Sequence, residues 1–169
     1  MNTASRRRRW TAAFAALLVP LTCSCKHIHT EVVIDAPSAA VWEVLRDTDA
    51  YPAWNPYHVR VDGVLAEGER LEVEVHKPNG NELVIHPRVE VLEAERELTW
   101  GGGVPGVFVG HHVFRLVPLP GDRTRLIHTE VFRGIAVPFA ELDTIEAGYE
   151  QVNRALAERV ESRQREAAL

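Results

Sequence analysis

Residues 139–165 read FAELDTIEAGYEQVNRALAERVESRQR. Large apolar side chains recur along this stretch at every third or fourth position, and charged residues lie between them. The apolar positions are Phe139, Leu142, Ile145, Tyr149, Val152, Leu156 and Val160. This spacing is typical of one face of an α-helix. The sequence therefore predicts a long C-terminal helix from about Phe139 to Arg165, with one apolar stripe that another element must cover.

Most of the chain before this helix alternates between apolar and polar residues, as half-buried strands do. The first such stretch runs from His27 to Asp35, and a short helix with Val41, Trp42 and Leu45 on its apolar face follows it. Further strands are expected at residues 57–62, 71–76, 83–91, 98–100, 109–117 and 124–132. In the first of these, Tyr57, Val59 and Val61 alternate with His58, Arg60 and Asp62. This order predicts an α+β fold, in which a curved antiparallel sheet buries one face against the C-terminal helix.

The composition is that of one folded domain behind a distinct N-terminal segment. The chain has 169 residues, of which 46% are hydrophobic and 25% charged, with a net charge of -5. Residues 1–25 contain four arginines and no acidic residue, so residues 26–169 hold the other 15 basic residues against all 24 acidic ones, a balance of -9. A body this acidic repels phosphate backbones, which argues against a nucleic-acid partner.

Residues 1–25 have the pattern of an export signal. Arg6 to Arg9 precede an uncharged run from Trp10 to Leu21, and the only two cysteines, Cys23 and Cys25, follow at once. A positive segment before a short apolar run is typical of signal peptides. The run has 12 residues, whereas a membrane-spanning helix needs about 20. We therefore expect two parts, a leader at residues 1–25 and one domain at residues 26–169.

Three interpretations of this leader stay open. In the first, it is a bacterial lipoprotein signal, and Cys23 or Cys25 is acylated and attaches the protein to a membrane. In the second, it is a cleaved secretory signal. Both predict an exported protein in the cell envelope. In the third, the start codon is assigned too early and the protein begins near Lys26, which would make it cytoplasmic.

Four segments of the sequence resemble the START/Bet v 1-like superfamily, also called SRPBCC or polyketide cyclase/dehydrase-like. They are Ile34 to Leu45 (IDAPSAAVWEVL), Tyr51 to Tyr57 (YPAWNPY), Gly110 to Leu116 (GHHVFRL) and Thr124 to Gly134 (TRLIHTEVFRG). The resemblance covers residues 27–165 and implies a helix-grip fold, a curved sheet wrapped around the long C-terminal helix. It also implies a hydrophobic cavity between sheet and helix, and it says almost nothing about the ligand. A lipoprotein-like leader is unusual for this superfamily.

Polar residues on the last two strands are the strongest candidates for chemistry. His112 lies in register with Phe114 and Leu116 along one strand, and His128 and Glu130 lie in register with Leu126 along the next. If the apolar residues point inward, the period of two carries all three polar residues inward. A hairpin centred near residues 120–121 places His112 almost opposite Thr129, beside both His128 and Glu130. A histidine and a glutamate in an apolar cavity are expected to form an imidazolium–carboxylate pair.

These residues have four possible roles. They can satisfy one another and fix the strand register, orient an apolar ligand, act as acid and base in a cyclisation or dehydration, or bind a metal. We expect a binder of a hydrophobic small molecule or lipid, without a metal or other cofactor. The alternatives are a polyketide cyclase/dehydratase-like enzyme with His112, His128 and Glu130 as candidate catalytic residues, and a partner-binding module with a collapsed cavity. The residues expected to contact a ligand are Trp54, Trp100, His112, Phe114, His128, Glu130, Phe132 and Tyr149.

Overall fold

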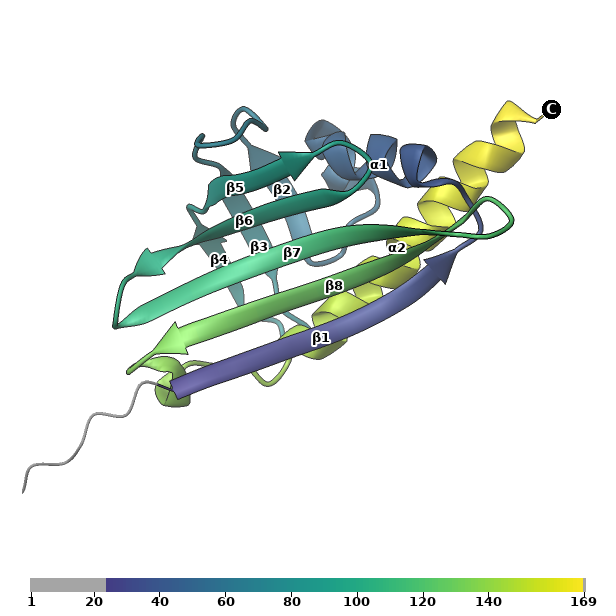
Figure 1. Cartoon of the computed structure of the whole chain (residues 1–169). Helices are drawn as coiled ribbons and strands as arrows, with labels where there is room; N and C mark the ends of the chain where they lie inside the picture. The colour runs from purple at the N-terminus through teal and green to yellow at the C-terminus, as the bar shows by residue number, and fades with distance from the viewer. Residues whose placement is uncertain (1–23, 169) are drawn as a thin grey trace, which may run out of the picture.

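A computed structural model describes residues 24–168 of the chain. The elements follow the predicted order of strand, helix, consecutive strands and long helix (Figure 1). They are β1 (Ser24–Ile34), α1 (Ser38–Arg46), the 3-10 helix η1 (Thr48–Ala53), β2 (His58–Asp62), β3 (Glu72–His76), β4 (Glu82–Ile85), β5 (Arg88–Glu93), β6 (Glu97–Val104), β7 (Phe108–Leu119), β8 (Arg123–Gly134), the 3-10 helix η2 (Val137–Phe139) and α2 (Ile145–Ala167).

The strands form two antiparallel sheets that together make one curved wall. Five strands pair in the order β1-β8-β7-β6-β5, and three pair in the order β2-β3-β4. The sheets meet at a corner where Arg70 bridges Arg88 and where the Leu71 N–H donates to the carbonyl of Pro87 at 2.9 Å. Figure 1 shows α2 running along one face of the larger sheet, behind β1 and β8. The predicted α+β helix-grip fold is confirmed.

The apolar stripe of α2 forms the centre of the core. Tyr149, Val152 and Leu156 are at most 2% exposed, and they pack among apolar side chains of the sheets and of α1. Gly148 lies on the same face, where a Cβ atom would overlap the ring of Tyr57. The absence of a side chain at residue 148 therefore lets Tyr57 pack directly against the helix backbone.

The long helix begins six residues later than the sequence pattern predicts. Residues 137–139 form η2, and Phe139, expected at the start of the buried stripe, is 89% exposed. Ala140, directly after η2, has an extended backbone (φ -84°, ψ 144°), and this break separates η2 from α2. Leu142 is nevertheless buried, so the segment before α2 packs against the domain without being helical.

The strand predicted over residues 83–91 is two strands that belong to different sheets. β4 ends at Ile85 and pairs with β3, whereas β5 begins at Arg88 and pairs with β6. Pro87 lies between them, where it removes one ladder donor and restricts the backbone of His86. The chain turns here from one sheet to the other, so the cavity described below is enclosed by both.

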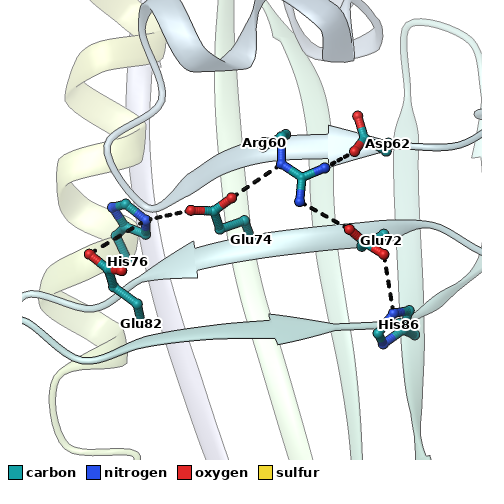
Figure 2. A network of polar contacts seen from close by, with 7 residues as sticks. All are labelled: Arg60, Asp62, Glu72, Glu74, His76, Glu82 and His86. Atoms are coloured by element: carbon teal, nitrogen blue, oxygen red, sulfur yellow. Dashed lines mark hydrogen bonds and ion pairs between the residues drawn. The ribbon is translucent and has the colours of Figure 1, made fainter.

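A network of charged side chains covers the outer face of β2, β3 and β4 (Figure 2). Arg60 donates to Glu72 at 3.0 Å and to Glu74 at 3.1 Å, and it also pairs with Asp62. Two histidines extend the network. The Nε2 atom of His76 lies 2.9 Å from the carboxylate of Glu74, and that of His86 lies 3.5 Å from the carboxylate of Glu72. The contacts of Arg60 join β2 to β3, and His76 lies 3.8 Å from Glu82 of β4, so the network spans the sheet whose inner face lines the cavity.

The leader predicted at residues 1–25 lies almost entirely outside the described residues. Cys23, one candidate for lipidation, is among those outside. Cys25, the other, is exposed in β1 and lies opposite Arg133 of β8. Within residues 24–168, no helix combines the length and apolar character needed to cross a membrane.

Candidate functional site

A cavity of about 470 Å³ lies between the two sheets and the N-terminal part of α2. Most of its wall is apolar, from side chains that include Val75, Ile85, Phe108, Leu142 and Ile145. Small-molecule sites in proteins have volumes of about 300–1,000 Å³ and a mostly apolar lining with a few polar groups. The volume and composition of this cavity are therefore those of a small-molecule site.

Five of the eight residues expected to contact a ligand line this cavity: Trp100, His112, Glu130, Phe132 and Tyr149. The other three lie elsewhere. Trp54 packs edge-on against Tyr51, with ring centroids 5.0 Å apart, and Phe114 is fully buried in the core. His128 is also fully buried and lies behind His112.

A chain of hydrogen bonds leads from the cavity wall into the core. The Nε2 atoms of His112 and His128 lie 2.7 Å apart. His128 Nδ1 lies 2.9 Å from Asn153 Oδ1, and the amide nitrogen of Asn153 donates to the hydroxyl of Thr30 at 2.9 Å. The hydroxyl of Thr30 donates to the backbone carbonyl of His128 at 3.3 Å. The chain joins β7, β8, α2 and β1, and so holds the His112 ring in a fixed orientation.

The histidines of the site are neutral. Burial lowers the pKa of His112 and of His128 well below the usual histidine value, and for His112 the neighbouring histidines lower it further. His58 also lines the cavity, with its ring centroid 4.9 Å from that of His112, and burial lowers its pKa to about 3. At neutral pH these rings offer uncharged donors and acceptors.

Glu130 makes a different contact from the one the sequence predicts. It lies directly opposite His112 in the β7–β8 ladder, not one residue away, and its carboxylate accepts a hydrogen bond from the hydroxyl of Tyr149. Burial raises the pKa of Glu130 to about 7, although the hydrogen bond from Tyr149 acts in the opposite direction. The predicted imidazolium–carboxylate pair is therefore wrong, because burial favours the neutral form of the histidines and of the glutamate alike.

Among the polar residues of the site that were not predicted are His58 and Asn153. His58 was expected to alternate away from Tyr57, but a β-bulge between His58 and Arg60 turns it inward, and it is only 2% exposed. Asn153 lies on the buried face of α2, between Tyr149 and Leu156. Asn153 could have been predicted, because it is a polar residue within the apolar stripe of the helix. The inward turn of His58 could not, because nothing in the local sequence marks the bulge.

Contacts between the β3–β4 turn and the segment before α2 border the mouth of the cavity. Lys77 donates to the backbone carbonyl of Glu141 at 2.8 Å, and Nδ2 atoms of Asn79 and Asn81 donate to its carboxylate at 2.9 and 2.7 Å. Lys77, Glu141 and the neighbouring Leu142 line the cavity. We call these contacts of Lys77, Asn79, Asn81 and Glu141 the polar latch. Asn79, Asn81 and Glu141 are not buried, whereas the side chain of Lys77 is only 12% exposed and lies against the cavity.

Metal binding has no support in the geometry of the described part of the chain. Across residues 24–168, no three His, Cys, Asp or Glu side chains are grouped so that they could hold a metal ion. Besides Lys77 and Glu141 at its mouth, the cavity is lined by the neutral imidazoles of His58 and His112, by two tyrosines and by Glu130, whose pKa is about 7. They can bind polar groups of an organic ligand, and the carboxyl can exchange a proton with it.

Comparison with known proteins shows what this arrangement resembles. Residues 26–161 match the sequence profile of a family described as polyketide cyclase / dehydrase and lipid transport. No curated protein matches the sequence.

Solved structures resemble the whole domain. The ZhuI aromatase/cyclase from Streptomyces sp. R1128 is 21% identical with a TM-score of 0.71, over 85% of this chain and 98% of that one. A START superfamily protein from Mycobacterium smegmatis is 22% identical with a TM-score of 0.60, over 80% of this chain and 97% of that one. At these identities the likeness establishes the fold.

Proposed function

Because the chain belongs to the polyketide cyclase / dehydrase and lipid transport family, we propose that its cavity binds a hydrophobic small molecule or lipid. The observation that carries this proposal is the cavity of about 470 Å³ beneath the N-terminal part of α2. A mostly apolar space of this size is unusual in a domain whose other large side chains are packed together. Moving an apolar ligand from water into it is favourable in proportion to the apolar area buried.

A neutral fluorescent probe tests this function directly. N-phenyl-1-naphthylamine fluoresces strongly in apolar surroundings, and we expect it to bind the full-length protein with one-to-one stoichiometry. Ile85→Trp places a large side chain in the cavity wall and should weaken the binding of the probe by about tenfold or more. Val33→Trp is the matched control, since Val33 is 47% exposed on β1 and does not line the cavity.

Three outcomes of the probe experiment differ in meaning. Weakened binding in Ile85→Trp alone supports the cavity as the site. Equal binding by both variants would contradict it, as would the absence of binding to the wild type. Circular dichroism of each variant shows that the loss of binding is not a loss of fold, and mass spectrometry under native conditions identifies any ligand that co-purifies.

The second candidate function is a cyclisation or dehydration of a polyketide-like substrate. The observation that favours it is Glu130, a cavity carboxyl with a pKa of about 7 that is hydrogen-bonded to Tyr149. A general acid or base is most effective when its pKa lies near the working pH. The matching test is Glu130→Gln, which should retain the probe but lose turnover of a candidate substrate. An enzyme that keeps its turnover in this variant does not use Glu130.

We also propose that the protein is exported and attached to a membrane through an acylated cysteine. The support is the leader sequence, in which four arginines and the apolar run from Trp10 to Leu21 come just before Cys23 and Cys25. Labelling with palmitate should be lost in Cys23→Ser or in Cys25→Ser, and it should be sensitive to globomycin. Labelling of neither cysteine would favour a secretory signal or a start near Lys26.

A further inference from the structure

In the hydrogen-bond chain behind the cavity, each group is either the donor or the acceptor of a given bond. The backbone carbonyl of His128 decides which group donates at each step. The hydroxyl of Thr30 donates its single hydrogen to the carbonyl oxygen of His128, which can only accept. The same hydroxyl must therefore accept from Asn153, whose amide nitrogen lies 2.9 Å away. This orients the amide of Asn153 with its oxygen toward His128.

The direction continues through the two imidazole rings. His128 Nδ1 lies 2.9 Å from the oxygen of Asn153 and must carry a hydrogen. A neutral imidazole carries only one hydrogen, so His128 Nε2 is an acceptor. His112 Nε2, 2.7 Å away, must then be the donor. Because His112 is neutral as well, its other nitrogen, Nδ1, is left with a lone pair and no hydrogen.

This last atom is buried and unsatisfied. Among the described residues, the Nδ1 atoms of His112 and His58 are buried side-chain nitrogens without a hydrogen-bond partner. Both rings line the cavity, and their centroids are 4.9 Å apart. His112 is 2% exposed, and its ring is stacked on Trp100. Buried acceptors in native proteins are normally paired, so this nitrogen marks a place for a donor.

We propose that His112 Nδ1 accepts a hydrogen bond from the ligand, so that the cavity selects neutral hydrophobic molecules that carry a hydroxyl group, such as a phenol or an alcohol. This inference rests on the proposed function and narrows its ligand class. An ether or ketone oxygen placed at the same point would face the lone pair of the nitrogen, and two acceptors repel each other. Thr30, Asn153 and His128 act as positioning residues, since they fix the hydrogen on the far side of the His112 ring.

Matched ligands of one size test the selection. 2-Naphthol and 2-methoxynaphthalene share the same ring system, but only the first has a hydroxyl hydrogen. In competition with N-phenyl-1-naphthylamine at pH 7, we expect 2-naphthol to bind about fivefold to tenfold more tightly, the effect of one hydrogen bond between neutral groups. The ratio of the two dissociation constants is the quantity of interest, because it cancels differences in the fit of the rings.

Three variants separate this role from a structural one. His112→Phe should bring the ratio close to one. His111→Phe is the matched control, because His111 is the next residue on the same strand and contacts Glu90 outside the cavity; its ratio should stay unchanged. Thr30→Val removes the hydroxyl that sets the direction of the chain, so the ratio should fall although Thr30 does not line the cavity.

The hydrogen positions can also be observed without any ligand. In the full-length wild type labelled with ¹⁵N-histidine, the nitrogen shifts and couplings should identify His112 Nδ1 as unprotonated and His128 Nδ1 as protonated. The reverse assignment overturns the inference, and so do equal affinities for the two naphthalenes or a failure of 2-naphthol to displace a bound probe. If the probe itself does not bind, the proposed function fails, and the nitrogen shifts still decide the direction of the chain.

Discussion

The carboxyl of Glu130 should make the stability of this protein depend on pH in a way that one substitution removes. In the folded protein, burial raises the pKa of Glu130 from 4.5 to about 7. A carboxyl with a raised pKa binds its proton more tightly in the folded state than in the unfolded state. Its contribution to stability is therefore fully present below pH 4.5 and is lost as the pH rises through 7.

The size of the effect follows from the shift. One unit of pKa corresponds to about 1.4 kcal/mol, so the rise of Glu130 from 4.5 to about 7 gives up to about 3 kcal/mol. Most of this change falls between pH 5 and pH 8. Glu130→Gln keeps the shape of the side chain and cannot ionise, so its hydrogen bond with Tyr149 is the same at every pH.

Urea unfolding of the wild type and of Glu130→Gln across this pH range measures the effect. The difference between their free energies of unfolding isolates Glu130, because the buried histidines contribute equally to both proteins. We expect Glu130→Gln to gain up to about 3 kcal/mol relative to the wild type as the pH rises from 5 to 8. Glu141→Gln, at an exposed carboxylate of the polar latch, is the control and should show no such trend.

A difference that stays constant with pH would refute the reasoning. It would mean that the carboxyl of Glu130 is well solvated in the folded protein, and that the cavity is open to water at this point. A carboxylate that a fixed cation stabilises would have a lowered pKa and would lose its contribution only below pH 4.5, outside this range, so it too would leave the difference constant.

Three further predictions concern other parts of the domain. Burial lowers the pKa of three histidines of the site, so the folded protein should lose stability as the pH falls below 6.5, and the melting temperature of the wild type should fall on the acid side. Gly148→Ala should destabilise the fold by about 1–3 kcal/mol in urea unfolding, because the new methyl group overlaps the ring of Tyr57; an unchanged midpoint would show that the ring can move away. Glu141→Ala removes the carboxylate that holds the polar latch and should speed both the entry and the release of the probe in stopped-flow fluorescence, with little change in the melting temperature; unchanged rates would mean that the ligand enters elsewhere.

The fold could be predicted from the sequence wherever one period of the apolar residues runs without interruption. The stripe from Ile145 to Val160 and the alternation in β7 and β8 are both confirmed by burial, and the four resembling segments lie within the family match at residues 26–161. The prediction failed where the apolar spacing continues across a break in the regular backbone. Pro87 separates β4 from β5, and the extended backbone at Ala140 separates η2 from α2.

The candidate site could be predicted only in part, for a similar reason. The period of two correctly places His112, His128 and Glu130 on one face, because the direction of a side chain along a strand depends only on its position. Their partners come from other elements. Asn153 and Tyr149 are on α2, and no local pattern says which rotamer brings them to the strands. The cost of burying charge, which decides that the histidines stay neutral, likewise appears only once the fold encloses them.

The charges around the cavity limit the kind of molecule that this site can hold. Among residues 24–168, Lys77 is the only lysine or arginine that lines the cavity, and its Nζ atom lies 3.6 Å from the carboxylate of Glu141 at the mouth. A carboxylate ligand such as a fatty acid anion would therefore lie close to Glu130 without a free cation to balance it. A molecule of the same size with a hydroxyl group meets neutral imidazoles instead. The neutral histidines and Glu130, whose pKa is raised by burial, thus favour the same class of ligand, whether the protein only carries it or also transforms it.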